Sequence, residues 1–293
     1  MSIVISYAVG NGDMFSIQHN SDNFTIIDCS MSDDNREWIL KDLNKYRKGK
    51  GIERFISTHP DQDHMMGLEY LDDSIKIVNF YCVKNKATKD EETDDFKRYC
   101  QLRDDEGKAF YLYKGCSRRW MNTSDEERKT AGINIHWPVL DNANFKSALQ
   151  EAAEGKSPNN ISPVVTYSVE NGGSFAWMGD LETAFMEKIQ DEVDWPSVNV
   201  LFAPHHGRDS GKVPNGILSA MDPDIVVIGE APSEHLNYYA SYNTITQNSA
   251  GTIGFECVDS YVHIYVSSDS YSVDFLVDHQ GTSYANYIGT LEV

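Results

Sequence analysis

The residues best suited to chemistry lie together in one short segment. His59, Asp61, Asp63 and His64 fall within six residues, directly after a stretch (53–58) that has the pattern of a β-strand. A loop at the end of a strand can aim several side chains at one point. Imidazole and carboxylate groups bind Zn²⁺, Mn²⁺ and Fe²⁺, and a carboxylate can bridge two ions. This segment therefore predicts a metal site.

Further imidazole and carboxylate groups follow other predicted strands. Asp180 comes after a strand predicted at 174–178, and the adjacent His205 and His206 follow one predicted at 198–202. The sequence does not decide which of the two histidines would face a metal ion. Several strand ends that each supply a His or an Asp are what a dinuclear site needs.

The order of these residues resembles the metallo-β-lactamase superfamily of hydrolases. The matching motifs are Asp28, His59-Pro60-Asp61-Gln62-Asp63-His64, Asp180 and His205-His206. The resemblance implies an α/β fold, an αββα sandwich with the site at one edge of two facing sheets. It also implies that two divalent metal ions are held by His59, Asp61, Asp63, His64, Asp180 and His205 or His206.

Two departures from the usual superfamily pattern change the expected metal. Asp61 stands where a second His is usual, and no His lies near Asn160, where another would be expected. Both departures are similar to the branch that includes the hydrolase domain of ComEC, the DNA-uptake channel protein. The motifs shared with that branch also include Val9-Gly10-Asn11-Gly12-Asp13, Asn159-Asn160-Ile161-Ser162, Gly179-Asp180-Leu181-Glu182, His205-His206-Gly207 and Gly251-Thr252-Ile253. An oxygen-rich donor set favours Mn²⁺, with Zn²⁺ as the alternative.

The resemblance implies a metal-dependent hydrolase, and the branch favours a phosphodiesterase or nuclease that acts on DNA, RNA or a nucleotide. A pair of metal ions in such a site activates water for attack on phosphorus. The expected catalytic residues are Asp63, His205 and His206, and the expected substrate contacts are Asn160, Ser162 and Arg208.

Two other functions stay open at this point. The chain could hydrolyse a small phosphoester, a carboxylic ester or a lactone, or it could bind a partner without turnover. The absent histidines argue against ester and lactone chemistry, and the retained ligand-type residues argue against a purely binding role. The net charge of -20 also argues against a broad basic surface for nucleic acid, so we expect a narrow basic path or a small substrate such as a cyclic nucleotide.

Length and composition favour one domain over 1–293, with a charge-rich, partly helical insertion at about 84–158. No apolar stretch approaches the roughly 20 residues that span a bilayer, and the N-terminus lacks the basic region of a secretory signal. The five cysteines are scattered, which favours a reducing compartment. We expect a cytoplasmic protein without a membrane partner; a protein partner or a homo-oligomer is left open.

The pattern of apolar residues predicts the elements that position the candidate site. Asp28 ends one predicted strand, and we expect it to brace the loop after residue 58 rather than to bind metal. A helix is predicted at 35–48, a short helix at 67–71 and another helix at 181–193. Strands are predicted at 2–8, 14–19, 24–28, 53–58, 75–83, 164–169, 174–178, 198–202, 225–228, 252–257, 261–266 and 272–277.

Overall fold

The strands of the computed structural model form two sheets, and the structure describes residues 1–232, 237–279 and 286–293. The first sheet is 9-stranded, in the order β16-β15-β14-β1-β2-β3-β5-β6-β7. Its strands are β1 (Ser2–Ser6), β2 (Phe15–Gln18), β3 (Asn23–Ile27), β5 (Ile52–Ser57), β6 (Phe80–Cys82), β7 (Ala109–Tyr111), β14 (Ile253–Val258), β15 (Tyr261–Val266) and β16 (Tyr287–Glu292). The strands from β3 to β7 run parallel, whereas β1 pairs antiparallel with both β2 and β14.

The second sheet is 6-stranded, in the order β13-β12-β11-β10-β9-β8. Its strands are β8 (Ile133–Trp137), β9 (Val164–Ser168), β10 (Ser174–Trp177), β11 (Val200–Phe202), β12 (Ile225–Ile228) and β13 (Asn243–Thr246). Strands β10 to β13 are parallel to one another. Side chains that follow β10 and β11 therefore emerge at the same end of this sheet.

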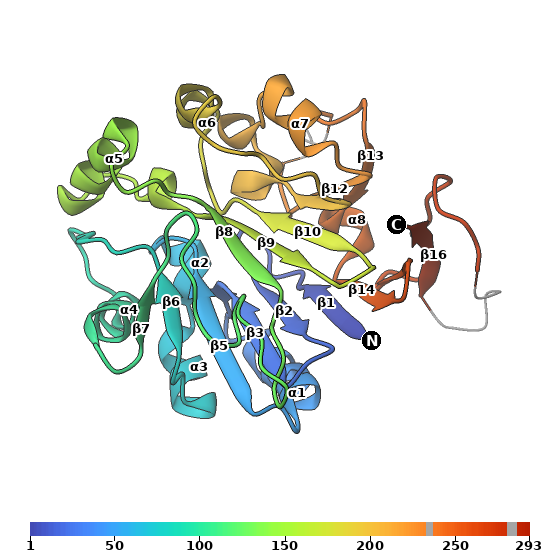
Figure 1. Ribbon diagram of the computed structural model, residues 1–293, viewed down its shortest axis with the longest axis horizontal. Helices are drawn as coiled ribbons and strands as arrows, with labels where there is room; N and C mark the ends of the chain where they lie inside the picture. The colour runs from blue at the N-terminus through green and yellow to red at the C-terminus, as the bar shows by residue number, and fades with distance from the viewer. Residues whose placement is uncertain (233–236, 280–285) are drawn as a thin grey trace.

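Helices cover the outer face of each sheet (Figure 1). The first sheet carries α1 (Arg36–Arg47), α3 (Leu68–Ile75) and α4 (Asp94–Asp104), and the second carries α5 (Ala143–Ala153), α6 (Thr183–Ile189) and α7 (Asn215–Met221). The chain also forms two four-residue helices, α2 (Gln62–Met65) and α8 (Gln247–Ala250). A two-residue strand, β4, covers Cys29–Ser30. In the part of the chain that the structure describes, no helix is long and apolar enough to cross a membrane.

The apolar core between the sheets explains why they face each other. Phe15 of the first sheet contacts Phe202 of the second, with ring centroids 4.8 Å apart, and Phe202 stacks on Trp177 at 5.0 Å. A second cluster of buried residues, which includes Ile39 and Leu43, packs α1 against the outer face of the first sheet. Burying apolar surface on both faces of a sheet stabilises a layered architecture. The predicted αββα sandwich is therefore confirmed.

The segment 84–158, which we expected to be an insertion, contributes a strand to each sheet. β7 extends the first sheet beside β6, and β8 extends the second beside β9. Before β7 the chain forms α4, between β7 and β8 it forms a long loop, and after β8 it forms α5. The segment thus joins the two sheets and places its loops beside the strand ends.

Two expectations about strands were wrong. Residues 272–277 form no strand apart from a single bridge between Val277 and Thr290. Phe275 and Leu276 pack on the core from a loop instead, which accounts for the apolar pattern. The predicted strand at 75–83 is also shorter, since Ile75 ends α3 and only Phe80–Cys82 is extended.

Candidate metal centre

The candidate centre lies where parallel strands of the two sheets end. His59 follows β5 of the first sheet, and Asp180 follows β10 of the second. Asp63 and His64 lie in α2, which begins directly after this loop. His206 lies in a short 3₁₀ turn after β11. Because these strand ends meet at one edge of the sandwich, residues far apart in sequence converge.

Four side chains form the tightest part of the centre: Asp13, His64, Asp180 and His206. One potential ligand atom from each lies within 4.8 Å of the others. His64 Nε2 is 3.0 Å from Asp180 Oδ1, and His206 Nε2 is 3.8 Å from Asp180 Oδ2. Asp13 reaches the cluster through His206, whose Nδ1 lies 3.1 Å from Asp13 Oδ1. Asp180 therefore sits at the middle of the group.

Two more of the predicted ligands border this cluster. Asp63 Oδ2 lies 3.4 Å from His206 Nε2. His59 Nε2 lies 3.9 Å from Asp180 Oδ2, the same oxygen that His206 approaches. The structure thus brings the predicted ligands His59, Asp63, His64 and His206 together around Asp180, and His205 Nε2 lies 3.7 Å from the same carboxylate.

The donor atoms of this centre fit a cation. The Nε2 atoms of the three buried histidines His59, His64 and His206 find no hydrogen-bond partner among the described residues, and neither does Asp180 Oδ1. The 3.0 Å approach of His64 to Asp180 therefore lacks hydrogen-bond geometry. An unpartnered buried polar atom costs roughly 1–3 kcal/mol, and several that converge on one point indicate a missing ion. These residues suit a divalent metal.

Asp28 fixes the orientation of His64. Its Oδ2 accepts a hydrogen bond from His64 Nδ1 at 2.9 Å and from the Thr58 hydroxyl at 2.6 Å. Its Oδ1 accepts from the Thr58 amide at 2.7 Å. A carboxylate on Nδ1 leaves the Nε2 lone pair available to a metal. These contacts match the bracing role predicted for Asp28.

His59 is oriented in a similar way by two hydroxyl groups. The Thr58 hydroxyl donates to Asp28, so its lone pair can accept from His59 Nδ1, 3.0 Å away. Ser162 Oγ lies 3.3 Å from the same His59 nitrogen and accepts from the Asp180 amide at 3.3 Å. Ser162 is fully buried. In this structure it therefore positions two candidate ligands, and substrate contact stays a prediction for it.

The two adjacent histidines have different environments. His206 is buried against Asp63 and Asp180, whereas the His205 side chain is 16% exposed, at the rim. His205 Nδ1 hydrogen-bonds Ser210 Oγ at 2.9 Å, which leaves Nε2 3.7 Å from Asp180 Oδ2. Both histidines have left-handed backbone angles (φ 52° and 57°), a conformation that costs roughly 1–2 kcal/mol per residue. Such strain is typical of functional sites.

Charge pairing shifts the pKa values of the group. Burial opposes protonation of His206, but Asp13 and Asp63 raise its pKa to about 10. Burial would raise the pKa of Asp63, yet His206 and His64 lower it to about 2. The pKa of His59 shifts in the opposite direction from that of His206, because burial and the neighbouring charge of His64 lower it to about 4. The metal-free centre thus holds protons on some of the imidazoles that would bind a cation.

Metal affinity should therefore depend on pH. In the metal-free protein His206 is protonated below its pKa of about 10, and a metal ion must displace that proton. We expect affinity for Mn²⁺ to rise by roughly tenfold per pH unit for each proton released. Calorimetric titration in two buffers of different ionisation enthalpy counts the protons. An affinity that stays constant between about pH 6 and pH 9 would contradict the assignment of His206.

Three other predicted site residues have protein partners or lie at the rim. Asp61 forms an ion pair with Lys89, a residue not singled out from sequence. The Asn160 side chain is engaged by Glu182, donating to its carboxylate at 2.8 Å and accepting from its amide at 3.1 Å. Arg208 follows the His205–His206 turn, and its buried Nε has no hydrogen-bond partner in the described part of the chain. Their metal-binding and substrate-binding roles stay predictions.

Asp13 is the member of the tight cluster that sequence reasoning did not assign. It belongs to the loop between β1 and β2, and its amide donates to the Asp63 carbonyl at 3.2 Å. Gly12 allows this approach, because a Cβ there would clash with Ser30 and with the backbone of Asp63. The acidic residue directly after Gly12, in a motif already noted, was the available signal.

Replacing Asp13 with Asn should weaken metal binding without removing a direct ligand. Asp13 accepts from His206 Nδ1 and helps to raise the pKa of that histidine. Loss of such an outer partner typically costs about 10–100-fold in metal affinity or activity. Titration of the variant with Mn²⁺ tests this, with exposed Asp33→Asn as a matched control. Equal affinity in wild type and D13N would show that Asp13 has no part in the centre.

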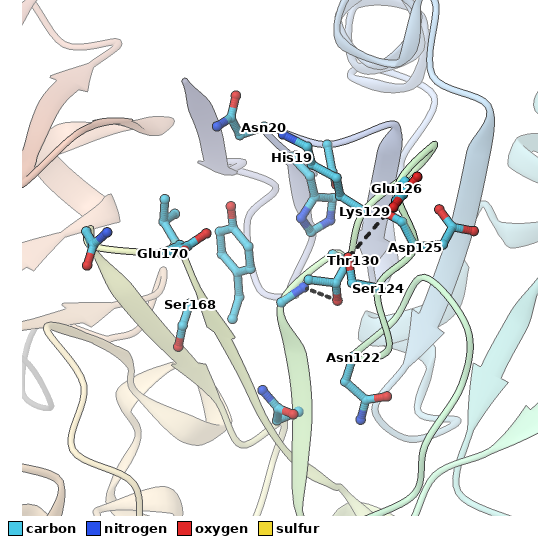
Figure 2. A pocket seen from close by; sticks show the side chains of 17 residues that line it. His19, Asn20, Asn122, Ser124, Asp125, Glu126, Lys129, Thr130, Ser168 and Glu170 are labelled. Atoms are coloured by element: carbon cyan, nitrogen blue, oxygen red, sulfur yellow. Dashed lines mark hydrogen bonds between the residues drawn. The ribbon is translucent and has the colours of Figure 1, made fainter.

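A separate cavity of about 940 Å³ lies at the opposite end of the sandwich. His19, which lines it, follows β2 and hydrogen-bonds to Asn23 at the start of β3, whereas Asp28 follows the end of β3. Figure 2 shows it between the turn of His19 and Asn20, the loop of Ser124 to Thr130, and Ser168 and Glu170. His19 Nε2 is hydrogen-bonded to Thr25, and Asp125 to Arg119 and Trp120, while His19 Nδ1 has no partner among the described residues. Within the described ranges, the group of side chains that could hold a metal ion is the strand-end cluster, not this cavity. We therefore assign the chemistry to the strand-end cluster.

The solved structures that are similar to the chain include two hydrolases. The novel metallo hydrolase Igni18 from the hyperthermophilic archaeon Ignicoccus hospitalis KIN4/I is 14% identical, with a TM-score of 0.48 over 87% of this chain and 99% of that one. A diphosphatase from the PhnP family is 13% identical, with a TM-score of 0.43 over 87% and 98%. No family model and no curated protein matches the sequence. The proposals below rest on this chain's own residues.

Proposed function

We propose that this protein is a metal-dependent hydrolase that cleaves phosphodiester bonds in DNA, RNA or a nucleotide. The observation that supports it most is the convergence of unpartnered Nε2 atoms from His59, His64 and His206 on the buried carboxylate of Asp180. The resemblance, with Asp61 where a second His is usual, favours Mn²⁺, and the three imidazoles and two carboxylates that converge here also suit Zn²⁺. The motif resemblance implies two ions. Asp61, the expected ligand of the second ion, is ion-paired to Lys89.

The ligands in this proposal are His64, Asp180, His206 and Asp63, with His59 beside them, 3.9 Å from Asp180 Oδ2. When bound, a divalent ion lowers the pKa of water and neutralises charge on a phosphate. The protein's part is to hold the imidazoles in the correct tautomer through Asp28, Thr58 and Asp13. Tight support of this kind keeps the ligand atoms in place during turnover.

His205 suits a hydrogen bond to a substrate phosphate. If its Nδ1 accepts from Ser210, the neutral ring carries its hydrogen on Nε2 at the partly exposed rim of the centre. Burial lowers the pKa of His205, which favours this neutral, hydrogen-bond-donating form. Arg208, whose guanidinium Nε has no partner among the described residues, is our candidate for the phosphate contact. Together they would supply a hydrogen-bond donor and positive charge beside the substrate.

The net charge of -20 restricts the form of the substrate. Broad phosphate neutralisation along a nucleic acid needs many Lys and Arg residues. We therefore favour a short single strand or a small phosphodiester such as a cyclic nucleotide. The proposal includes a cytoplasmic location, which the five free cysteines, four of them buried, support.

Turnover on a substrate panel tests the proposed function. Single-stranded DNA, double-stranded DNA, RNA and cyclic nucleotides would each be incubated with the protein and Mn²⁺, with a chelated sample as the control. We expect at least one phosphodiester to be cleaved only when metal is present. Metal binding without cleavage of any member of the panel would overturn the assignment to phosphodiesters and leave the metal centre standing.

A further inference from the structure

The two sides of the candidate centre differ in what balances their charge. Around His64 and His206 the carboxylates of Asp13, Asp63 and Asp180 lie against imidazoles, and among the described residues no Lys or Arg forms an ion pair with them. On the side of His59 the carboxylate of Asp61, the expected ligand of a second ion, is hydrogen-bonded and ion-paired to Lys89. The Lys89 ammonium thus already balances the charge of the carboxylate expected at the second metal position.

The loop that carries Lys89 is anchored on both sides of it. Before Lys89, Thr88 donates its amide to Ala152 at 3.1 Å and its hydroxyl to Ala153 at 3.0 Å, at the end of α5. Further back, the buried Asn85 donates to the Tyr99 hydroxyl at 2.7 Å. These contacts come from two different helices, so the path of the loop is fixed over several residues.

The loop is also tied to the metal-binding loop itself. Thr93, which caps α4, donates to Gln62 at 3.0 Å, and Asp95 accepts from the Gly67 amide at 3.0 Å. Gln62 stands between Asp61 and Asp63 in the sequence. Contacts between these two loops therefore hold the Lys89 ammonium against Asp61. The Lys89 side chain is only 23% exposed.

A divalent ion at the His59 side would have to displace this ammonium. Two cations near the same carboxylate repel each other, more strongly where water is partly excluded. With Asp61 occupied, the described donors left beside His59 are the shared Asp180 and, at the rim, His205, whose Nε2 lies 3.7 Å from the same Asp180 oxygen. That is fewer than the four that a zinc-type site usually has. The ligand set on the His64 side is fuller.

We propose that Lys89 takes the place of a second metal ion, so that the centre holds one divalent ion beside a fixed ammonium. The inference rests on the metal centre of the proposed function. A substrate phosphate would meet one metal ion and one lysine. The sequence shows Lys89 at the start of a Lys-Asp-Glu-Glu run, where it looks like part of a solvated surface.

Counting bound metal tests this without using activity. Wild type, Lys89→Met, Lys89→Arg and the double variant Lys89→Met/Asp61→Asn would be dialysed against Mn²⁺, and in parallel against Zn²⁺. Metal per chain is then measured by mass spectrometry. We expect one ion in wild type, two in K89M because Asp61 is freed, one in K89R, and one in the double variant. Lys86→Met is the matched control, since Lys86 is exposed and faces Asp104, and it should bind one ion.

Electron paramagnetic resonance of the Mn²⁺ samples gives an independent readout. Two ions that share Asp180 should show exchange coupling in K89M, and a single ion in wild type should not. Two tightly bound ions in wild type, or one ion in a folded K89M, would overturn the role of Lys89 while leaving the hydrolase proposal intact. No bound ion in any variant would overturn the metal centre, and this inference with it.

Discussion

Replacing Asp180 with Asn is expected to abolish detectable metal-dependent turnover and to weaken Mn²⁺ binding by more than about 100-fold. That exceeds the roughly 10–100-fold cost of losing an outer hydrogen-bond partner, because Asp180 contacts the candidate ligands directly. Its carboxylate lies 3.0 Å from His64 and within 4 Å of both His59 and His206. Burial alone would raise the pKa of Asp180, yet the charges of His64 and His59 hold it well below its usual value.

The fold should survive this change, which makes the test specific. His64 keeps its hydrogen bond to Asp28, and His206 keeps Asp13. Circular dichroism and thermal unfolding of the metal-free variant check this. The exposed Asp191→Asn serves as the matched control and should bind metal as wild type does. A D180N protein that binds Mn²⁺ with wild-type affinity would exclude Asp180 as the central ligand.

Removal of metal is expected to lower thermal stability as well as activity. A ligand present at 100 times its Kd stabilises the native state by about 2.7 kcal/mol. For a chain of this length that corresponds to a fall in Tm of roughly 4–5 °C on chelation. The effect arises because the unpartnered Nε2 atoms and the buried Asp180 lose the cation that satisfies them.

Calorimetric scans with Mn²⁺, with chelator, and with Mn²⁺ restored measure this difference. The shift should reverse when metal is added back, and D180N should show a much smaller one. If the Tm of wild type were the same with and without chelator, the cluster would be stable as a set of protein contacts alone, and the metal assignment would lose its main support.

Most of the sandwich could be predicted from the sequence because its strands alternate regularly with short turns. The helix expected at 35–48 is α1 (Arg36–Arg47), and the strand expected at 53–58 is β5 (Ile52–Ser57). The pattern failed where tertiary contacts decide. β7, β8, β13 and β16 were missed, and the apolar residues at 272–277 pack on the core without joining a sheet.

The centre could be predicted in part for a similar reason. Ligand-type residues at strand ends are visible along the chain, so His59, His64 and Asp180 could be named before any contact was known. Asp13 was visible only as the last residue of a glycine-containing motif, and Lys89 gave no signal, because the contacts of both depend on how distant loops pack. Lys89 reaches Asp61 only through anchors on α5 and α4, and Asp13 reaches His206 across 193 positions in the sequence.

The charge on Asp61 shows where motif reasoning stops. The motif places a carboxylate at that position, but it does not indicate whether a metal ion or a lysine will balance the charge. That outcome is set by the 84–158 segment, whose strands β7 and β8 belong to the two sheets and whose first loop crosses to the centre.

The most direct test of the account is hydrolysis of bis-p-nitrophenyl phosphate by wild type and by Asp63→Ala, each with added Mn²⁺. Asp63 is a partly exposed member of the centre, 3.4 Å from His206. We predict Mn²⁺-dependent release of nitrophenol by wild type and none above background by D63A, with both proteins folded. Turnover by D63A at the wild-type rate would contradict the proposed centre.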